Sequence, residues 1–157
     1  MKIKYNNKKF TKFLEQSSVI KIEKNQLGYI EQKLKNHRSA RLCLHRNIKD
    51  KHQEMIIAQK KFNFFPPKKN TESDQTFLIL KGVLLIIIFD YKGNIKKKIK
   101  LSNKHNLLAR VKKNTFHCDI PISKFSIHLE TKNTIFNSKV NKLANFPFQF
   151  NKKIIKN

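Results

Sequence analysis

Short apolar segments separated by turn residues run through the middle of the chain, from about residue 55 to residue 130. They are rich in Ile, Val, Leu and Phe, and one of them alternates apolar side chains with Lys, which favours strands over helices. Strands this short and regularly spaced, with no long helix between them, predict a β-sandwich or β-barrel. The predicted strands are residues 55–58, 62–65, 76–80, 83–89, 95–101, 107–111, 116–120 and 125–130.

Turn-forming residues separate these segments. Residues 68–75 follow two prolines and contain no apolar side chain, which predicts a loop. Gly82 lies between two apolar runs and predicts a bend, because only glycine adopts a positive φ at little cost. Residues 90–94 predict a hairpin turn with Gly93 in the left-handed conformation, and residues 121–123 predict a further turn.

The two ends of the chain are more polar than its centre. Three apolar side chains follow helical spacing within residues 8–16 and predict a short helix, while residues 21–34 predict a weaker one. An apolar cluster at residues 143–148 is expected to dock on the barrel. We therefore predict one domain in three parts: a helical or irregular N-terminal extension over residues 1–36, a barrel over residues 37–136 and a C-terminal docking tail over residues 137–157.

The 157-residue chain carries 35 Lys and Arg against 10 Asp and Glu, a formal charge of +25. This excess leaves open a basic protein that binds nucleic acid or an anionic surface without catalysis, because phosphate contacts release counterions. Composition offers another explanation, since Lys, Asn, Ile and Phe all have codons rich in A and T. The cations are mostly dispersed Lys, whereas proteins that read nucleic acid more often concentrate Arg beside stacking aromatics.

Cysteine usage and apolar stretches bear on the cellular compartment. Cys43 and Cys118 have no CxxC spacing, so neither a zinc knuckle nor a redox motif is present. Two free thiols suit a reducing compartment, with one disulfide between them as the alternative. The longest apolar stretch, residues 82–89, is too short to cross a bilayer, and no secretory leader is visible. We expect a cytoplasmic protein without a membrane span, and open sheet edges leave a homodimer open.

Several segments follow the order and spacing of one known family. Residues 40–45, Ala-Arg-Leu-Cys-Leu-His, stand where that family opens with Ala-Arg-x-x-x-His, and residues 53–55 match its Gln-Met-type segment. Residues 83–94 match an apolar strand ending in Phe-Asp-x-x-Gly, and residues 129–147 fit the closing segment. On these motifs most of the chain resembles the WbuC-type proteins of the RmlC-like cupin superfamily, which are found in bacterial polysaccharide gene clusters.

This resemblance implies a mainly β protein with a single-domain cupin jelly roll, a double-stranded β-helix. It also implies a role in surface-polysaccharide (O-antigen or capsule) biosynthesis, in which the protein binds or modifies a sugar nucleotide, a sugar phosphate or another anionic small molecule. The residues leave open whether the protein is an enzyme. No Ser-His-Asp array, phosphate-binding glycine loop or HExxH motif is present.

The metal motif of the superfamily is altered in this chain. Cupin motifs place two His and a Glu on one pair of strands and a further His on a facing strand. Lys68, Asn70 and Gln75 stand at the first three positions, and only His117 remains. An ammonium has no lone pair, and neutral amides are poor partners for a transition metal. We therefore expect a degenerate site that binds a divalent metal weakly or not at all, with His117 as its one retained ligand.

The same positions suggest an anion site instead. The Arg41 guanidinium suits bidentate contact with phosphate or carboxylate, and Lys68 places a positive charge where a metal would otherwise bind. The alternative is that Arg41 is solvated or structural and that His117 is a hydrogen-bonded core residue. Cys118 follows His117 on a strand and so points to the opposite face, which argues against a dyad. The predicted ligand-binding residues are Arg41, His45, Lys68, Gln75 and His117.

Overall fold

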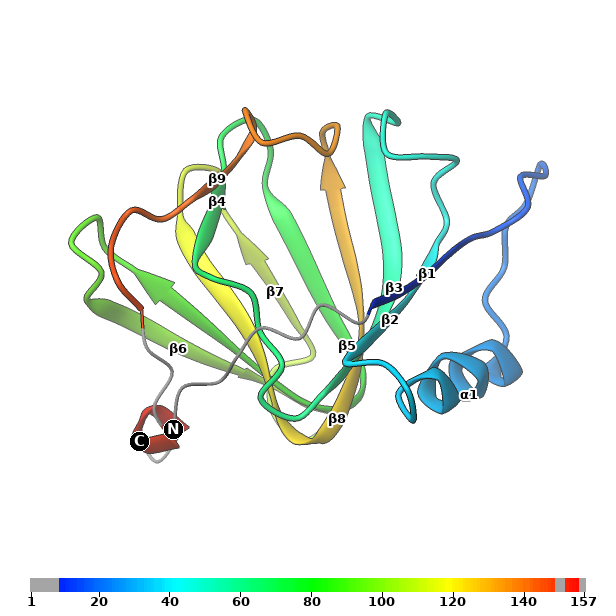
Figure 1. Ribbon diagram of the computed structural model, residues 1–157, viewed down its shortest axis with the longest axis horizontal. Coiled ribbons are helices and arrows are strands. Elements are labelled where there is room, and N and C mark those ends of the chain that lie inside the picture. Colours follow the sequence, from blue (N-terminus) through cyan, green and yellow to red (C-terminus); the bar gives the residue numbers. More distant parts are fainter. Residues whose placement is uncertain (1–8, 149–151, 156–157) are drawn as a thin grey trace.

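The computed structural model of the protein describes residues 9–148 and 152–155. Its framework is one curved sheet of nine strands with helix α1 packed against the outside (Figure 1). Within these residues no helix is long and apolar enough to traverse a lipid bilayer. The elements are β1 (Lys9–Phe13), α1 (Lys24–Lys33), β2 (Ser39–Cys43), β3 (His52–Lys60), β4 (Lys68–Asn70), β5 (Gln75–Phe89), β6 (Ile95–Leu101), β7 (Leu108–Val111), β8 (Phe116–Asn133), β9 (Asn141–Leu143) and the 3₁₀-helix η1 (Lys152–Ile155).

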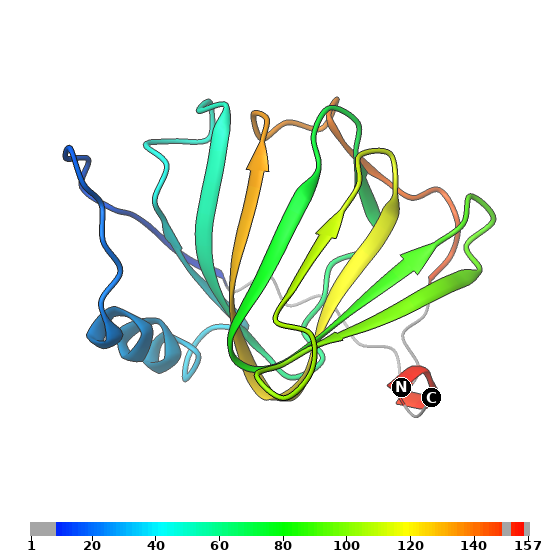
Figure 2. The same ribbon diagram turned by 180° about the vertical axis from the view of Figure 1, so that it is seen from behind.

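Strand β8 organises the sheet because several partners share its length. On one edge its second half pairs antiparallel with β3, and its first half pairs with β4. On the other edge it pairs with β5 over nearly its full length, and β5 in turn pairs with β6 and β7. Figures 1 and 2 show β5 and β8 as long curved ribbons between the β1–β3 half and the β6 half. The sheet therefore bends around an interior whose two faces β8 helps to build.

Strands β5 and β8 are each continuous where the sequence predicted a break. β5 passes through Gly82, whose φ is 81°, and its register with β8 shifts on both sides of that residue. The turn predicted at residues 121–123 is wrong, because β8 runs straight through them. Pro121 lacks an N–H, but it pairs with Leu84 beside the register shift, where a strand tolerates a missing donor.

The first described segment is a strand, so the helix predicted over residues 8–16 is wrong. β1 pairs in parallel with β2 along its whole length, and this ladder satisfies the backbone groups of an otherwise open edge. Strand geometry sends Phe10 and Phe13 to opposite faces. The Phe10 ring meets Tyr29 of α1 at 5.9 Å outside the sheet, and the Phe13 ring meets His45 at 5.5 Å on the inner side.

Helix α1 fixes which side of the β2–β3–β8 region faces inward. The helix begins at a reciprocal capping box between Glu23 and Gln26 and buries Ile30. Its apolar face packs on a layer that all three strands contribute: Ala40, Leu42, Ile56, Ala58 and Ile127. Because side chains alternate along a strand, the opposite rows of these three strands point into the interior.

The turn and loop predictions fare unevenly. The hairpin at residues 90–94 is confirmed, with Gly93 at φ 90°. Residues 62–65, predicted as a strand, form a loop with Phe62 at φ 59°. The region predicted as a loop over residues 68–75 contains the short strand β4, which pairs with both β8 and β9.

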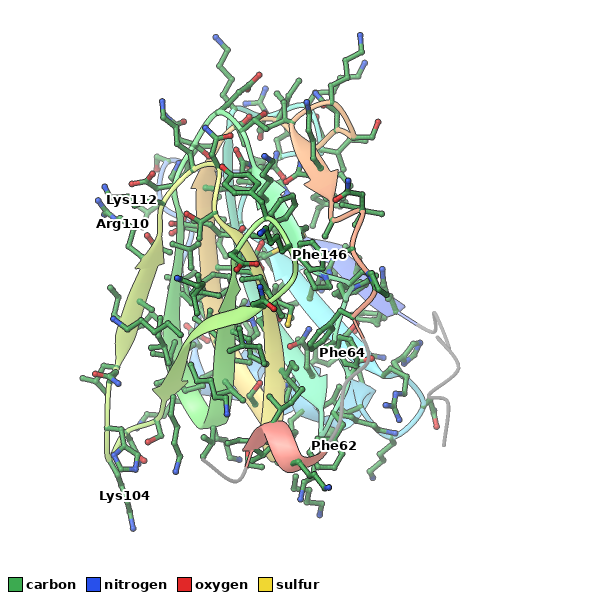
Figure 3. All side chains as sticks on the ribbon, turned by 90° about the vertical axis from the view of Figure 1, so that its left-hand side faces the viewer. Phe62, Phe64, Lys104, Arg110, Lys112 and Phe146 are labelled. Carbon is green, nitrogen blue, oxygen red and sulfur yellow. The ribbon has the colours of Figure 1, made fainter. Side chains whose placement is uncertain are left out.

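Segments from both sides of the barrel cover the outer face of β5 and β8 at the end away from α1. Phe64, Phe146 and Phe148 pack there on a buried layer that includes Phe89 and Phe116. The Phe146 ring lies 5.3 Å from that of Phe116, and Phe148 lies 4.9 Å from Phe89. Figure 3 shows Phe64 and Phe146 on this side and Lys104, Arg110 and Lys112 on the opposite edge. Apolar contacts therefore cover the outer face of β5 and β8 at this end of the barrel.

Candidate functional site

The inner face of β8 carries a continuous row of polar side chains. Ser126, His128, Glu130 and Lys132 alternate with residues that face outward, and all four are buried. Across the ladder they stand opposite inward-facing residues of β3 and β5: Gln53, Met55, Ile57 and Gln59 on β3, and Gln75, Phe77 and Ile79 on β5. His117 and Asp119 extend the polar row into the first half of β8. Charged groups therefore enter the barrel from its central strand.

Part of the interior is open and part is filled. An apolar layer fills one part: Phe77, Ile79, Leu84, Ile86, Leu101 and Val111. Beside it lies a cavity of about 240 Å³, which opens between β1, β2, β3 and β8. Its charged lining consists of Arg41 and Lys68 from β2 and β4, and Asp119, Glu130 and Lys132 from β8. Aromatic side chains also line the cavity, namely Phe13, Phe65 and Phe136.

Three of the five predicted ligand-binding residues line this cavity: Arg41, His45 and Lys68. The side chains of Arg41 and Lys68 are half-buried, and the Nε of Arg41 is buried with no hydrogen-bond partner in the described structure. The Arg41 guanidinium also lies over the Phe65 ring at 5.8 Å. His45 is 7% exposed, and its Nδ1 lies 2.9 Å from the Glu54 carbonyl oxygen. His45 therefore supports the wall as well as lining it.

The other two predicted residues, Gln75 and His117, form a buried pair beside the cavity. His117 Nδ1 donates to the Thr115 carbonyl at 2.9 Å, and its Nε2 lies 3.2 Å from the Gln75 side-chain amide. Burial lowers the pKa of His117, and the charge of Lys68 lowers it further, so the ring is neutral and Nε2 is an acceptor. The Gln75 atom at this distance is Oε1, so the amide must turn over to present its NH₂ group to this acceptor; as placed, Gln75 Nε2 has no hydrogen-bond partner in the described structure. The pair therefore accounts for His117 as a hydrogen-bonded residue of the interior.

The donor set does not fit the metal that the cupin superfamily implies. No group of three or more His, Cys, Asp or Glu side chains converges within the described part of the chain. Asn70 Oδ1 accepts hydrogen bonds from two backbone N–H groups, those of Glu72 and Ser73, so this amide shapes the turn after β4. Lys68 stands directly opposite His117 on the paired strands, which places a cation beside the one retained imidazole. These side chains are therefore unsuited to holding a divalent transition metal.

The charged groups of the cavity face one another without direct pairing. Among the described residues, ion pairs within 4.0 Å form only outside the cavity: Lys21–Glu23, His52–Glu54, Lys81–Glu31 and Lys112–Asp74. Burial raises the pKa of Glu130, but the attraction of Lys68, Lys132 and Arg41 outweighs burial and leaves that pKa lowered. Burial lowers the pKa of Lys132 to about 8, although Glu130 opposes that change. The site therefore holds separated charges, three of them cationic.

Sequence reasoning missed the β8 row, including Asp119, His128, Glu130 and Lys132. Alternation in residues 126–132 was the available signal, but alternating polar side chains ordinarily indicate a solvent-facing row. Here α1 covers the apolar row, and the polar row turns inward. Burying this polar row costs desolvation free energy, most clearly at His128. Both of its ring nitrogens are fully buried and have no hydrogen-bond partner in the described structure.

Comparison with solved structures identifies the class of fold. A structure of CapF with the inhibitor 3-isopropenyl-tropolone gives a TM-score of 0.57 at 12% identity, covering 68% of this chain and 31% of that chain. The capsular polysaccharide assembling protein CapF from Staphylococcus aureus gives 0.54 at 13% identity, covering 68% and 32%. KdgF from Halomonas sp. gives 0.51 at 13% identity, covering 65% and 84%. These proteins have the cupin fold, and the chain is accordingly a cupin jelly roll, as predicted.

The similarity establishes the fold alone. No protein-family model matches the chain, and no curated relative matches it. The chain spans about a third of the length of the CapF chains and most of the length of KdgF. A shared fold does not define a ligand, so the residues of the cavity determine what it binds.

Proposed function

We propose that the barrel cavity binds a small anion, with a phosphorylated sugar as the favoured class, in a WbuC-like cupin of surface-polysaccharide metabolism. The observation that carries the proposal is the set of three cations, Arg41, Lys68 and Lys132, around one cavity. Among the described residues, no carboxylate lies within ion-pairing distance of any of them. Two carboxylates, Asp119 and Glu130, offset only part of that charge. A bound anion would complete the balance, and the Arg41 guanidinium would supply bidentate contact.

The volume of the cavity limits the size of the ligand that it can enclose. Pockets that enclose drug-sized molecules measure about 300–1,000 Å³, whereas this cavity measures about 240 Å³. A sugar phosphate or a short acid fits this scale better than an entire sugar nucleotide. A sugar nucleotide would place one end in the barrel and leave the rest outside its mouth.

Two observations support the polysaccharide context. The motifs at residues 40–45 and 83–94 resemble WbuC-type proteins. CapF, which shares the fold at 12–13% identity, is described as a capsular polysaccharide assembling protein. That description belongs to CapF, and it guides the choice of ligands for testing here.

Calorimetric titration of the full chain with inorganic phosphate, a hexose phosphate and a sugar nucleotide tests the proposal. We expect saturable binding that weakens at least about tenfold in Arg41→Gln and Lys68→Met, because each variant removes one cavity cation. Lys97→Gln, which changes an exposed lysine of β6, serves as the matched control and should bind as the parent does. Equal affinity in all four proteins, or no saturable binding, would overturn the proposal.

A second candidate function rests on a different surface. A groove of about 770 Å³ beside α1 has ten lining residues, and five are cations: Lys35, Arg38, Lys60, Lys61 and Lys124. This is half of the lining, against 35 of 157 residues in the whole chain, so the groove is richer in cations than the chain average. Its one acid, Glu31, is already paired with Lys81 at 2.7 Å. The groove favours a phosphate backbone, and we propose single-stranded RNA as its ligand.

Backbone contacts hold these groove cations together. The Lys60 N–H donates to the Arg38 carbonyl, and the Lys61 N–H donates to the Lys124 carbonyl, each at 3.0 Å. A salt titration of RNA binding tests this second function. Lys60→Gln with Lys124→Gln should lower the slope of log affinity against log salt by about one to two. The control pair Lys96→Gln with Lys97→Gln carries the same charge change on β6, and an equal effect there would exclude a groove-specific site.

A further inference from the structure

Lys132 is the one cavity cation that the composition of this chain does not explain. A chain with 35 Lys and Arg is expected to carry many lysines on its surface. A buried lysine is different, because an unpaired ammonium loses its hydration when it enters the interior. Lys132 is 3% exposed and forms no ion pair within the described structure. Burying the Lys132 ammonium in this way lowers the stability of the fold, which suggests that the residue has a function.

We infer that Lys132 is a nucleophilic amine that forms an imine with the carbonyl group of an aldehyde- or ketone-bearing phosphate held in the barrel. This inference rests on the anion-binding function proposed above and names the substrate class of that site. Lys132 lines the cavity together with Arg41 and Lys68, the residues that would hold the phosphate. Its amine thus has access to the same enclosed space as the ligand.

The surroundings of Lys132 position its amine without neutralising it through an ion pair. Nζ donates to the Asn141 side-chain oxygen at 3.2 Å and lies 4.9 Å from the centre of the Phe136 ring. On the flanking strands Lys132 pairs with Gln53 of β3 and Gln75 of β5, both uncharged. Glu130 lies two residues away on the same face of β8, where its carboxylate would stabilise a positively charged imine.

The protonation state agrees with this geometry. Burial, together with the charges of Lys68 and Arg41, lowers the pKa of Lys132 from 10.5 to about 8, and Glu130 only partly opposes the change. At pH 7 about a tenth of such amines are neutral, whereas a lysine with an ordinary pKa has roughly one neutral amine in three thousand. A desolvated lysine close to other cations is the arrangement that activates an amine toward carbonyl compounds.

The step balances without a metal or a redox partner. The neutral amine attacks the carbonyl carbon, a C–N bond forms, and the carbonyl π electrons move to oxygen, which gains the proton that nitrogen releases. The resulting carbinolamine takes up one proton and loses water as its C–O bond breaks, which leaves a protonated imine. One amine, one carbonyl compound and one proton give one iminium ion and one water molecule.

Reductive trapping tests the inference on the full chain. The protein is incubated with glyceraldehyde 3-phosphate and sodium cyanoborohydride, and adducts are located by intact mass and peptide mapping. We expect Lys132 to be labelled at least about tenfold faster at pH 7 than the exposed Lys97. Labelling of Lys132 should rise from pH 7 and level off near pH 9, whereas labelling of exposed lysines continues to rise. Unphosphorylated glyceraldehyde should label Lys132 more slowly.

Variants and a competitor separate this inference from the proposed function. Lys132→Arg keeps the charge but has no primary amine that can form an imine, so it should lose the adduct. If Lys132→Arg does not fold, Lys132→Met replaces it as the variant that lacks the amine. In the control variant Lys97→Arg, Lys132 should be labelled at the same rate as in the parent protein. If phosphate binds with the Arg41 and Lys68 dependence described above but adducts appear only on exposed lysines, the imine inference alone is overturned. If phosphate neither binds nor competes with labelling, the proposed function fails as well.

Discussion

At the scale of single residues, the interior of the barrel is defined by buried polar groups with incomplete pairing. His128 is the extreme case, because it is fully buried and neither ring nitrogen has a hydrogen-bond partner in the described structure. His117, by contrast, is satisfied by Thr115 and Gln75. Removing an unsatisfied buried polar group can stabilise a protein. Removing one member of a hydrogen-bonded pair instead leaves the other member buried without a partner, which destabilises the protein.

We therefore predict that His128→Leu raises the free energy of unfolding by about 1 kcal/mol at pH 7. Burial lowers the pKa of His128 in the folded state, so between that lowered value and 6.5 the unfolded chain binds more protons than the folded one. Stability is therefore lost as pH falls below 6.5, by up to about 1.4 kcal/mol per unit for each such histidine. Urea unfolding from pH 7 to 5.5 should show a shallower loss in His128→Leu.

The control for this pH effect is His105→Gln, which changes an exposed histidine. It should retain the stability and the pH slope of the parent protein. A slope in His128→Leu equal to that of the parent would show that His128 is not a buried neutral group.

A second residue-scale prediction concerns the bend in β5. Gly82 has φ 81°, and a Cβ there would overlap the carbonyl oxygen of Phe125 and approach Ser123 Oγ to 2.8 Å. Gly82→Ala should lower the free energy of unfolding by about 2 kcal/mol or more, through strain and collision. Gly28→Ala is the matched control, because it lies in α1 with no atom within 4 Å and should stabilise by about 0.5–1 kcal/mol. Urea midpoints measure both, and equal shifts would contradict the account.

At the scale of elements, the sequence predicted apolar strands well and misjudged where they stop. β6 and β7 lie at or within one residue of their predicted ranges, because short alternating segments between clear turns have one natural pairing. β8 was split at Pro121, since a proline in mid-strand is usually a terminator. The register shift around Gly82 on the partner strand accommodates it, and no local pattern in β8 reveals that partner.

Contacts between segments far apart in the sequence explain both the error at β1 and the cavity residues that were not predicted. The spacing of Phe10 and Phe13 suits a helix, but pairing with β2 overrides so short a local signal. Arg41, His45 and Lys68 were predicted because a family motif marks them, and all three line the cavity. Glu130 and Lys132 were not, because only the position of α1 shows which row of β8 is inside.

The outer apolar layer gives an element-scale prediction. Phe146 contacts the rings of Phe89 and Phe116 at 5.7 and 5.3 Å, so it anchors the segment after β9 to the barrel. Phe146→Ala should lower the free energy of unfolding by about 2–3 kcal/mol, less than for a fully buried Phe because the side chain is half-exposed. Leu143→Ala, whose side chain is 66% exposed, should cost under about 0.5 kcal/mol in the same urea experiment. Similar losses for both would rule out Phe146 as the anchor.

At the scale of the whole molecule, the excess of positive charge opposes compaction. A formal charge of +25 on 157 residues places like charges close together on most of the surface. We predict that raising NaCl from about 20 to 300 mM increases the midpoint temperature of thermal unfolding. Added salt shortens the distance over which like charges repel, so the folded state is less destabilised. Phosphate at matched ionic strength should raise the midpoint further if the cavity binds it. A midpoint that falls with NaCl would mean that attractive ion pairs dominate instead.

The central position of β8 has a consequence for synthesis on the ribosome. β3 and β5 emerge first, yet the edge that each presents to β8 stays unpaired until the segment ending at Asn133 has been made. During that interval the nascent chain displays two apolar strands with open edges, the features that promote association between chains. The many lysines around those strands then act before folding is complete, since mutual repulsion keeps neighbouring nascent chains apart.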